Sequence, residues 1–287
     1  MDRRNTFKKA VHERRALLVP GAANGLTARI IEDLGYEAVY LTGAGLANTS
    51  FGMPDLGMVT MTEVVEMATA ITDCCSLPLI VDADTGFGNP LNMVRTVRSL
   101  ERAGAAALQV EDQVFPKRCG HFSGKEVIPA ADMVAKIKAA VDTRRSQDLL
   151  IIARTDALAI DGLSAALDRA AAYIEAGADI TFVEAPTTVE EMRKIPVALP
   201  VPQLINLVVG GRTPLRSRAE LEEMGFALVL YANAALQASV KATMGVLGSL
   251  REQGSLDAVL EQLADFRTRQ NTVKIDRWQE LEKTYRS

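Results

Sequence analysis

Residues 163–183 read LSAALDRAAAYIEAGADITFV, a helical pattern followed by a glycine and then by a strand pattern. Apolar residues at three- and four-residue steps predict a helix over 163–176, and the apolar run at 180–183 predicts a buried strand. Gly177 stands between them, where a left-handed backbone ends a helix at the least cost. We interpret this stretch as one helix–strand unit.

The same arrangement recurs along the chain. Helical patterns at 26–34, 93–103 and 221–224 are each followed by a glycine and an apolar run, and further apolar runs occupy 17–19, 77–81, 149–153 and 203–205. About eight strands separated by helix-length spacers result. Strands that are apolar throughout are typical of parallel sheets. The sequence therefore predicts an α/β fold, a (β/α)8 TIM barrel formed by residues 1–287 as a single domain.

Helical patterns continue after Tyr231, at 234–250, 256–267 and 273–285. The first would be the eighth helix of the barrel, and the others exceed what eight units need. We expect the C-terminal helices from about 234 to pack on a neighbouring subunit or to cover the barrel, and we therefore expect an oligomer.

Composition excludes several classes of protein. The net charge of −4 over 287 residues gives no reason to expect a nucleic-acid or membrane surface. No apolar segment approaches the length of a membrane span, and the charged N-terminus lacks the apolar core of a secretion signal. The three cysteines, Cys74, Cys75 and Cys119, cannot all pair and show no zinc-ligand spacing. These features favour a cytoplasmic protein.

Polar residues end most of the predicted strands. They are Thr42, Asp82, Glu111, Arg154, Glu184 and Asn206. In a barrel these ends meet at one rim, where active sites lie. The alternative is that strand ends are polar only because loops follow.

Carboxylates gather at this predicted rim. Asp82 and Asp84 follow the strand at 77–81 in the stretch DADTGFG, Glu111 follows the next strand, and Asp55 lies in the loop after the second strand. Mg²⁺ takes oxygen ligands and keeps several waters, so it would relieve the repulsion between these acids, with Mn²⁺ as a substitute. Alternatively, the acids are solvated, or Asp82 or Glu111 forms a salt bridge with Arg154.

The segment 114–129 contains Lys117-Arg118-Cys119-Gly120-His121 and has neither helical nor strand periodicity. Its length predicts a functional lid. Positive neighbours lower the pKa of a thiol, so Cys119 is a candidate proton donor, with Lys117 and His121 beside it. The alternative is an exposed basic loop with an incidental cysteine.

Two further features suit an anionic ligand. The glycine-rich turn at 42–45 exposes backbone N–H groups, and Arg154 can bind a carboxylate with both arms of its guanidinium. Arg154 could equally pair with Glu111 or Glu184. Arg212 is either a second anion contact or only a loop charge.

Five motifs together resemble the isocitrate lyase/phosphoenolpyruvate mutase superfamily. In order they are DADTGFG (82–88), EDQ (111–113), KRCGH (117–121), ARTD (153–156) and FVEA (182–185). The KRCGH loop resembles that of the carbon–carbon lyase branch, and it also occurs in a phosphonomutase of the superfamily.

The resemblance implies a Mg²⁺-dependent barrel, usually a homotetramer in which the eighth helix is exchanged between subunits. It implies direct metal binding by Asp82, with Asp55, Asp84 and Glu111 holding the metal's waters. It implies that Cys119 is the general acid. It implies that Thr42, Gly43, Ala44 and Arg154 bind the substrate carboxylate and that Glu184 and Asn206 line the pocket. Arg154 and Glu184 are also candidate catalytic residues, and Gly120, Arg212 and Asn233 are further candidate substrate contacts.

Two stretches depart from the pattern of the lyases. Val209 replaces the acidic residue that is common after Asn206, and Ala232-Asn233-Ala234 follows Tyr231 where many lyases read Pro-Leu-Ser. Both lie where the resemblance places the distal part of the substrate.

These observations lead to one hypothesis and its rivals. We expect a Mg²⁺-dependent lyase that acts on a small-molecule carboxylate, a 2-hydroxy di- or tricarboxylate of the substituted-malate type, with Cys119 as the general acid. The alternatives are a phosphonomutase, an oxaloacetate hydrolase or decarboxylase, or a barrel that binds a dicarboxylate without catalysis.

Overall fold

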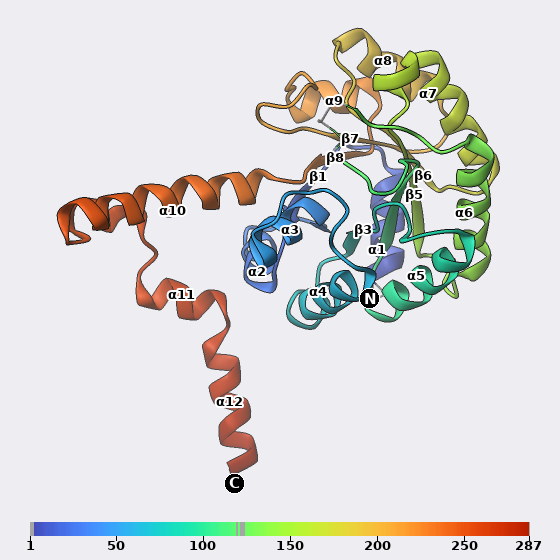
Figure 1. Cartoon of the computed structure of the whole chain (residues 1–287). Coiled ribbons are helices and arrows are strands. Elements are labelled where there is room, and N and C mark those ends of the chain that lie inside the picture. The colour runs from blue at the N-terminus through green and yellow to red at the C-terminus, as the bar shows by residue number, and fades with distance from the viewer. Residues whose placement is uncertain (1–2, 119, 121–123, 287) are drawn as a thin grey trace.

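The strands form one closed parallel barrel in the order β1 to β8, with β8 paired to β1 (Figure 1). The computed structural model describes residues 3–118, 120 and 124–286. The strands are β1 (Leu17–Ala22), β2 (Val39–Leu41), β3 (Leu79–Asp82), β4 (Ala107–Glu111), β5 (Leu150–Thr155), β6 (Ile180–Val183), β7 (Gln203–Asn206) and β8 (Leu228–Tyr231). The predicted TIM barrel is confirmed.

Helices follow the strands and cover the outside of the barrel (Figure 1). They are α2 (Gly25–Asp33), α3 (Gly43–Phe51), α4 (Met61–Cys74), α5 (Pro90–Arg102), α6 (Ala130–Thr143), α7 (Leu158–Glu175), α8 (Val189–Ala198) and α9 (Arg218–Met224). The glycines of the repeated sequence unit have positive φ angles, 81° at Gly35, 90° at Gly104, 103° at Gly177 and 97° at Gly225. The left-handed helix stop predicted from the sequence is therefore present four times.

The N-terminal helix α1 (Arg3–His12) covers the amino-terminal end of the barrel. Phe7 and Val11 are each 1% exposed and pack in the same cluster as the barrel residues Val19 and Leu150. The side chain of Arg4 donates to the carbonyl of Ala105, 2.8 Å away, just before β4 begins. This end of the barrel is thus filled by apolar side chains and covered by a helix.

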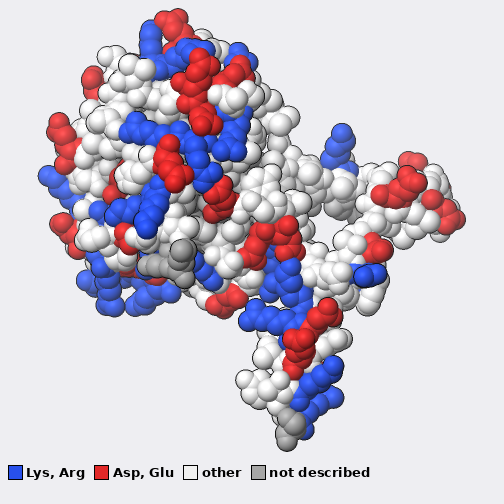
Figure 2. Space-filling model, turned by 180° about the vertical axis from the view of Figure 1, so that it is seen from behind, with Lys and Arg blue, Asp and Glu red and all other residues white. Residues whose placement is uncertain are grey.

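The last helices leave the barrel. The helix α10 (Ala234–Gln253) projects away from it (Figure 1), contains no buried residue and carries few charges near the barrel (Figure 2). It is followed by the 3₁₀ helix η1 (Asp257–Gln262), α11 (Phe266–Thr272) and α12 (Ile275–Arg286). Among the described helices, none has the length and apolar character needed to cross a bilayer.

The predicted continuous helix over 256–267 is wrong. Leu263 is extended after η1, and Asp265 then caps a new helix by accepting a hydrogen bond from the backbone N–H of Thr268, 2.6 Å away. Asp is a strong N-cap because its carboxylate satisfies an N–H that has no partner inside the helix. The periodicity of apolar residues continues across this break and therefore does not predict it.

Candidate active site

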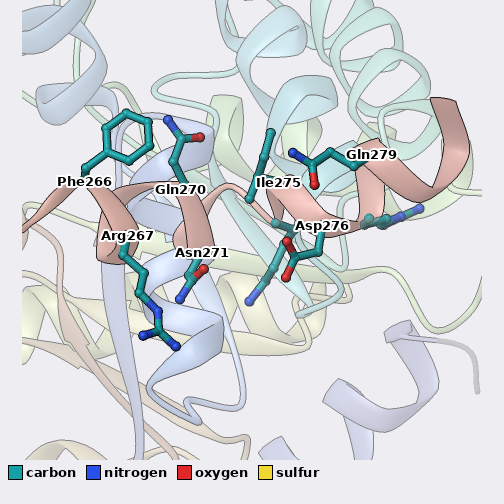
Figure 3. A pocket seen from close by; sticks show the side chains of 9 residues that line it. Phe266, Arg267, Gln270, Asn271, Ile275, Asp276 and Gln279 are labelled. Carbon is teal, nitrogen blue, oxygen red and sulfur yellow. The ribbon is translucent and has the colours of Figure 1, made fainter. Parts of the chain in front are cut away.

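Two hollows differ in their chemistry. One, of about 850 Å³, lies between α11 and α12, and side chains such as Phe266, Asn271 and Asp276 line it (Figure 3). It contains none of the residues at the ends of the barrel strands. The other, of about 40 Å³, lies at the carboxyl ends of the strands, where barrel enzymes have their active sites.

The small cavity brings together most of the residues expected from the sequence. Its lining includes Thr42, Ala44, Asp55, Asp82, Lys117, Gly120, Arg154, Glu184, Asn206 and Asn233. Tyr40, Phe182, Leu230 and Ala232 complete the lining. Side chains from at least six different strand ends and loops therefore meet at one place, although they are far apart in the sequence.

Other expected residues lie beside or beyond the cavity. Asp84 and Glu111 are buried next to its lining. Arg212 does not line the cavity, and Val209 is 63% exposed. Cys119 and His121 lie outside the described residues.

The helix α3 begins where a glycine-rich turn was expected. Thr42 is its N-cap, and its hydroxyl accepts a hydrogen bond from the N–H of Gly45, 3.1 Å away. The N–H groups in the first turn of a helix have no partner within the helix, and the helix dipole makes this end positive. Gly43 and Ala44 therefore carry backbone groups that suit a ligand carboxylate.

Asp82 is buried at the end of β3 and is held by neutral donors. Its carboxylate accepts from the N–H of Gly43 at 3.3 Å, the N–H of Asp84 at 3.2 Å and the side-chain amide of Gln109 at 3.4 Å. The hydroxyl of Tyr40 in turn donates to Gln109, 2.9 Å away. This chain fixes the orientation of the Asp82 carboxylate, and no cation among the described residues pairs with it.

Lys117 reaches into the carboxylate group from the segment after β4. Its ammonium pairs with Asp55 and lies 3.0 Å from Asp84, and all three side chains are at least 88% buried. Burial raises the pKa of Asp84 to about 7; Lys117 lowers this pKa, and the nearby charges of Asp82 and Asp55 raise it. The expected loop lysine is thus an integral part of the acidic cluster.

Arg154 is surrounded by three acids. It lies 3.3 Å from Glu111 and 3.9 Å from Glu184, and its Nε donates to Asp156, 2.9 Å away. The alternative predicted from the sequence, pairing of Arg154 with Glu111 or Glu184, is therefore observed. Because Arg154 also lines the cavity, this pairing leaves it able to contact a ligand.

The acidic cluster fits a hard divalent cation that keeps its waters. One oxygen of Glu111, Oε1, is buried without a hydrogen-bond partner among the described residues, and burial raises the pKa of this carboxyl well above its usual value. In the described part of the chain, no three Asp, Glu, His or Cys side chains could hold a metal by themselves. Oxygen donors with room for water suit Mg²⁺, which is often bound by one or two carboxylates.

Two buried residues near the cavity were not expected from the sequence. Lys125 and Asp156 form an ion pair of 2.6 Å and contact Gly120 and Arg154, which line the cavity. Asp156 belongs to the ARTD motif, so the sequence places it near the site. Its partner Lys125 is buried and lies 31 residues away, and sequence spacing does not predict that the two side chains meet.

Comparison with known proteins agrees with this architecture. The family model described as phosphoenolpyruvate phosphomutase matches residues 7–250. The 2,3-dimethylmalate lyase of Eubacterium barkeri is 43% identical over 279 residues, which are 97% of this chain and 96% of that protein. The 2-methylisocitrate lyase of Vibrio cholerae is 43% identical over 263 residues, 90% of this chain and 85% of that protein.

Solved structures share the whole fold. A crystal structure of 2,3-dimethylmalate lyase superposes with a TM-score of 0.93 and 34% identity, covering 99% of this chain and 96% of that one. A phosphonopyruvate hydrolase crystallised with oxalate and Mg²⁺ superposes with a TM-score of 0.90 and 29% identity, covering 100% of both chains.

Proposed function

The chain belongs to the phosphoenolpyruvate phosphomutase family, and on that premise we propose a specific reaction for it. The predicted superfamily and enzyme class, a carbon–carbon lyase, are confirmed by its relatives. We propose that it is a Mg²⁺-dependent lyase that cleaves a 2-hydroxy di- or tricarboxylate of the substituted-malate type to a 2-oxo acid and a carboxylate. The observation that carries this proposal is the meeting of Asp82, Lys117 and Arg154 at one cavity.

The acidic side of the cavity would hold the metal. Asp82 would bind Mg²⁺ directly, while Asp55, Asp84 and Glu111 would hold its waters. When bound, the ion would supply electrostatic stabilisation for negative charge on the oxygen atoms of the substrate, an effect worth several kcal/mol in metal enzymes. Lys117 would balance the remaining negative charge of the cluster, since it already pairs with Asp55 and Asp84.

The start of α3 and Arg154, which adjoin the acidic cluster, would orient the 2-hydroxy acid. The N–H groups of Gly43 and Ala44 at the start of α3 would bind its carboxylate, and Arg154 would contact the same moiety. Glu184, Asn206 and Asn233 would line the remainder. A substrate held by both a helix N-terminus and a guanidinium has its reacting bond in a fixed direction, which lowers the entropic part of the barrier.

The bond cleavage would leave a carbanion that needs a proton. The substrate hydroxyl would lose its proton to a base, the adjacent carbon–carbon bond would break, and its electron pair would remain on the departing carbon, delocalised onto the neighbouring carboxylate. Cys119 would donate the proton that neutralises this carbon. Lys117 and Gly120, which stand on either side of Cys119 in the sequence, both line the cavity, and this supports the proposed role of the thiol.

A substrate panel tests the reaction. Purified protein with Mg²⁺ would be assayed for release of a 2-oxo acid from 2,3-dimethylmalate and 2-methylisocitrate, beside oxaloacetate and phosphonopyruvate. We expect turnover of at least one substituted malate and loss of turnover after chelation with EDTA. Turnover of only oxaloacetate or a phosphonate would overturn the lyase proposal, and turnover that EDTA leaves intact would overturn the metal dependence.

We further propose that residues 1–287 form one cytoplasmic domain that assembles as a homotetramer by exchanging α10. Val240, Met244 and Leu247 lie on one face of this helix and are 52%, 71% and 56% exposed, which is costly for a helix that stays in water. Light scattering would measure the mass. We expect four copies for the native chain and smaller species for Met244→Glu, and a native monomer would contradict the proposal.

A further inference from the structure

Asp156 joins two buried cations, Arg154 and Lys125, beside the cavity. Its carboxylate accepts from Nε of Arg154 at 2.9 Å and from Nη2 of Arg154 at 3.1 Å, so the guanidinium is held by a two-armed contact. The same carboxylate accepts from the ammonium of Lys125 at 2.6 Å. Asp156 is 0% exposed and does not line the cavity, so it acts on a ligand only through its neighbours.

Lys125 extends this chain back to the cavity. Its ammonium also donates to the carbonyl of Gly120, 2.6 Å away. A Cβ atom at Gly120 would lie 2.4 Å from Nη2 of Arg154 and 2.4 Å from Oε1 of Glu184, so the backbone here rests directly on these two side chains. Asp156, Lys125, Gly120 and Arg154 thus form a closed ring of contacts.

The ring is itself anchored to the barrel. The carboxylate of Asp112 accepts from the N–H of Asp156 at 3.0 Å, from the hydroxyl of Thr155 at 2.7 Å and from the hydroxyl of Tyr173 at 2.7 Å. Each of these residues is buried. Buried and fully hydrogen-bonded groups have little freedom to move, so the Asp156 carboxylate has a fixed position.

Two acids compete with Asp156 for the same guanidinium. Glu111 and Glu184 lie 3.3 Å and 3.9 Å from Arg154, and Glu184 lines the cavity. Without the two-armed contact to Asp156, Arg154 would be free to turn and pair fully with these acids. An arginine neutralised in this way would contact a ligand carboxylate less well.

We propose that Asp156 is a positioning residue that aims Arg154 at the substrate carboxylate and, through Lys125, fixes the carbonyl of Gly120 beside it. This inference rests on the proposed function, in which Arg154 binds a 2-hydroxy or 2-oxo carboxylate. Oxalate, a small dicarboxylate, serves as the probe because its binding does not require turnover.

The test compares the affinities of oxalate and Mg²⁺ by calorimetry on the full chain. We expect Asp156→Asn to weaken oxalate binding about tenfold or more, because a charge-assisted contact that orients Arg154 is lost. Mg²⁺ affinity should fall several times less, because Arg154 contacts Glu111 but not Asp82, the proposed direct ligand. Merely structural damage would weaken both. Unchanged oxalate affinity, or a parallel loss of both affinities, would overturn the proposal.

A second variant guards against failure to fold. Asp156→Asn leaves the buried ammonium of Lys125 without its acidic partner, whereas the double variant D156N/K125M restores the net charge of the native group and avoids that penalty. We expect the same loss of oxalate affinity in the double variant, and an affinity equal to that of the native chain would refute the role of Asp156.

A carboxylate far from the cavity, Asp179, provides the matched control. Asp179→Asn removes another partly buried carboxylate, which pairs with Arg144 at 2.5 Å at the opposite end of the barrel, and it should lower stability without changing oxalate affinity. A native chain that binds oxalate but turns over no panel member would contradict the proposed function, while the comparison of oxalate affinities would still decide the role of Asp156.

Discussion

The ammonium of Lys117 lies 3.0 Å from the carboxylate of Asp84, inside a cluster where burial raises the pKa of that carboxyl to about 7. The lysine belongs to the segment after β4 and the aspartate to the segment after β3, so this contact joins two neighbouring loops at the mouth of the barrel. It also means that a cation of the chain itself already offsets part of the negative charge that the proposed metal would meet.

Replacement of Lys117 by methionine tests this balance of charge. The metal-free variant should lose about 3–5 kcal/mol of unfolding free energy, because Asp55 and Asp84 then share a buried site without a cation. Mg²⁺ should raise the melting temperature of the variant more than that of the native chain. Lys194→Met, which removes an exposed partner of Glu190, is the control and should change neither quantity. An equal effect of Mg²⁺ on both chains would count against a shared site.

Asp82→Asn tests the proposed direct metal ligand. The amide keeps the size of the side chain, so the fold should persist, but Mg²⁺ or Mn²⁺ affinity should fall about 100-fold or more, since even outer partners of a metal site cost 10–100-fold. Mn²⁺ binding followed by electron paramagnetic resonance measures this directly. Undiminished Mn²⁺ binding would remove Asp82 from the proposed site.

Cys119→Ser tests the proton donor. Ser is a much weaker acid, so the rate of cleavage should fall about 10²–10⁴-fold, while Mn²⁺ and oxalate should bind as they do to the native chain. Steady-state assays with the substrate identified from the panel, together with calorimetry, separate the two effects. Cleavage at the native rate would exclude the thiol as the acid.

Gly120→Ala tests how closely the backbone approaches the site. The new methyl group would meet Arg154 and Glu184 at 2.4 Å, so these side chains have to shift. A misplacement of about 1 Å can cost about 100-fold in rate without unfolding the barrel. Gly35→Ala is the opposite control. Its position has a φ of 81° with nothing nearby, so the variant should lose about 1–2 kcal/mol of stability yet keep its activity. If Gly120→Ala retained native activity, the close packing of Gly120 against Arg154 and Glu184 would not be needed for function.

Much of the fold could be predicted because its signal is local and repeated. The glycines at 35, 104, 177 and 225 each sit between a helix and a strand, and the structure has all four with positive φ. The start of α3 was read as a turn, since Gly43 and Gly45 weaken helical periodicity, whereas Thr42 caps a helix there. A helix N-cap depends on one hydrogen bond from a backbone N–H to a side chain, and a pattern of apolar residues does not predict that bond.

The residues of the candidate site also fall into those that the sequence predicts and those that it does not. Asp82, Arg154 and Asn206 could be predicted because strand ends of a barrel converge whatever the loops do. Lys125 could not, because its partners Asp156 and Gly120 are set by the path of an irregular segment. Arg212 was a candidate on charge alone, and the path of its loop keeps it out of the cavity lining.

The helix α1 closes the amino-terminal end of the barrel, where Phe7 and Val11 are buried among apolar side chains of the strands. The substrate and both products of the proposed cleavage would therefore enter and leave at the carboxyl ends of the strands. Departure would then be sequential. In the proposed reaction, the fragment bound by Arg154 and the start of α3 would leave last and inhibit competitively against substrate, whereas the outer fragment would leave first and inhibit noncompetitively.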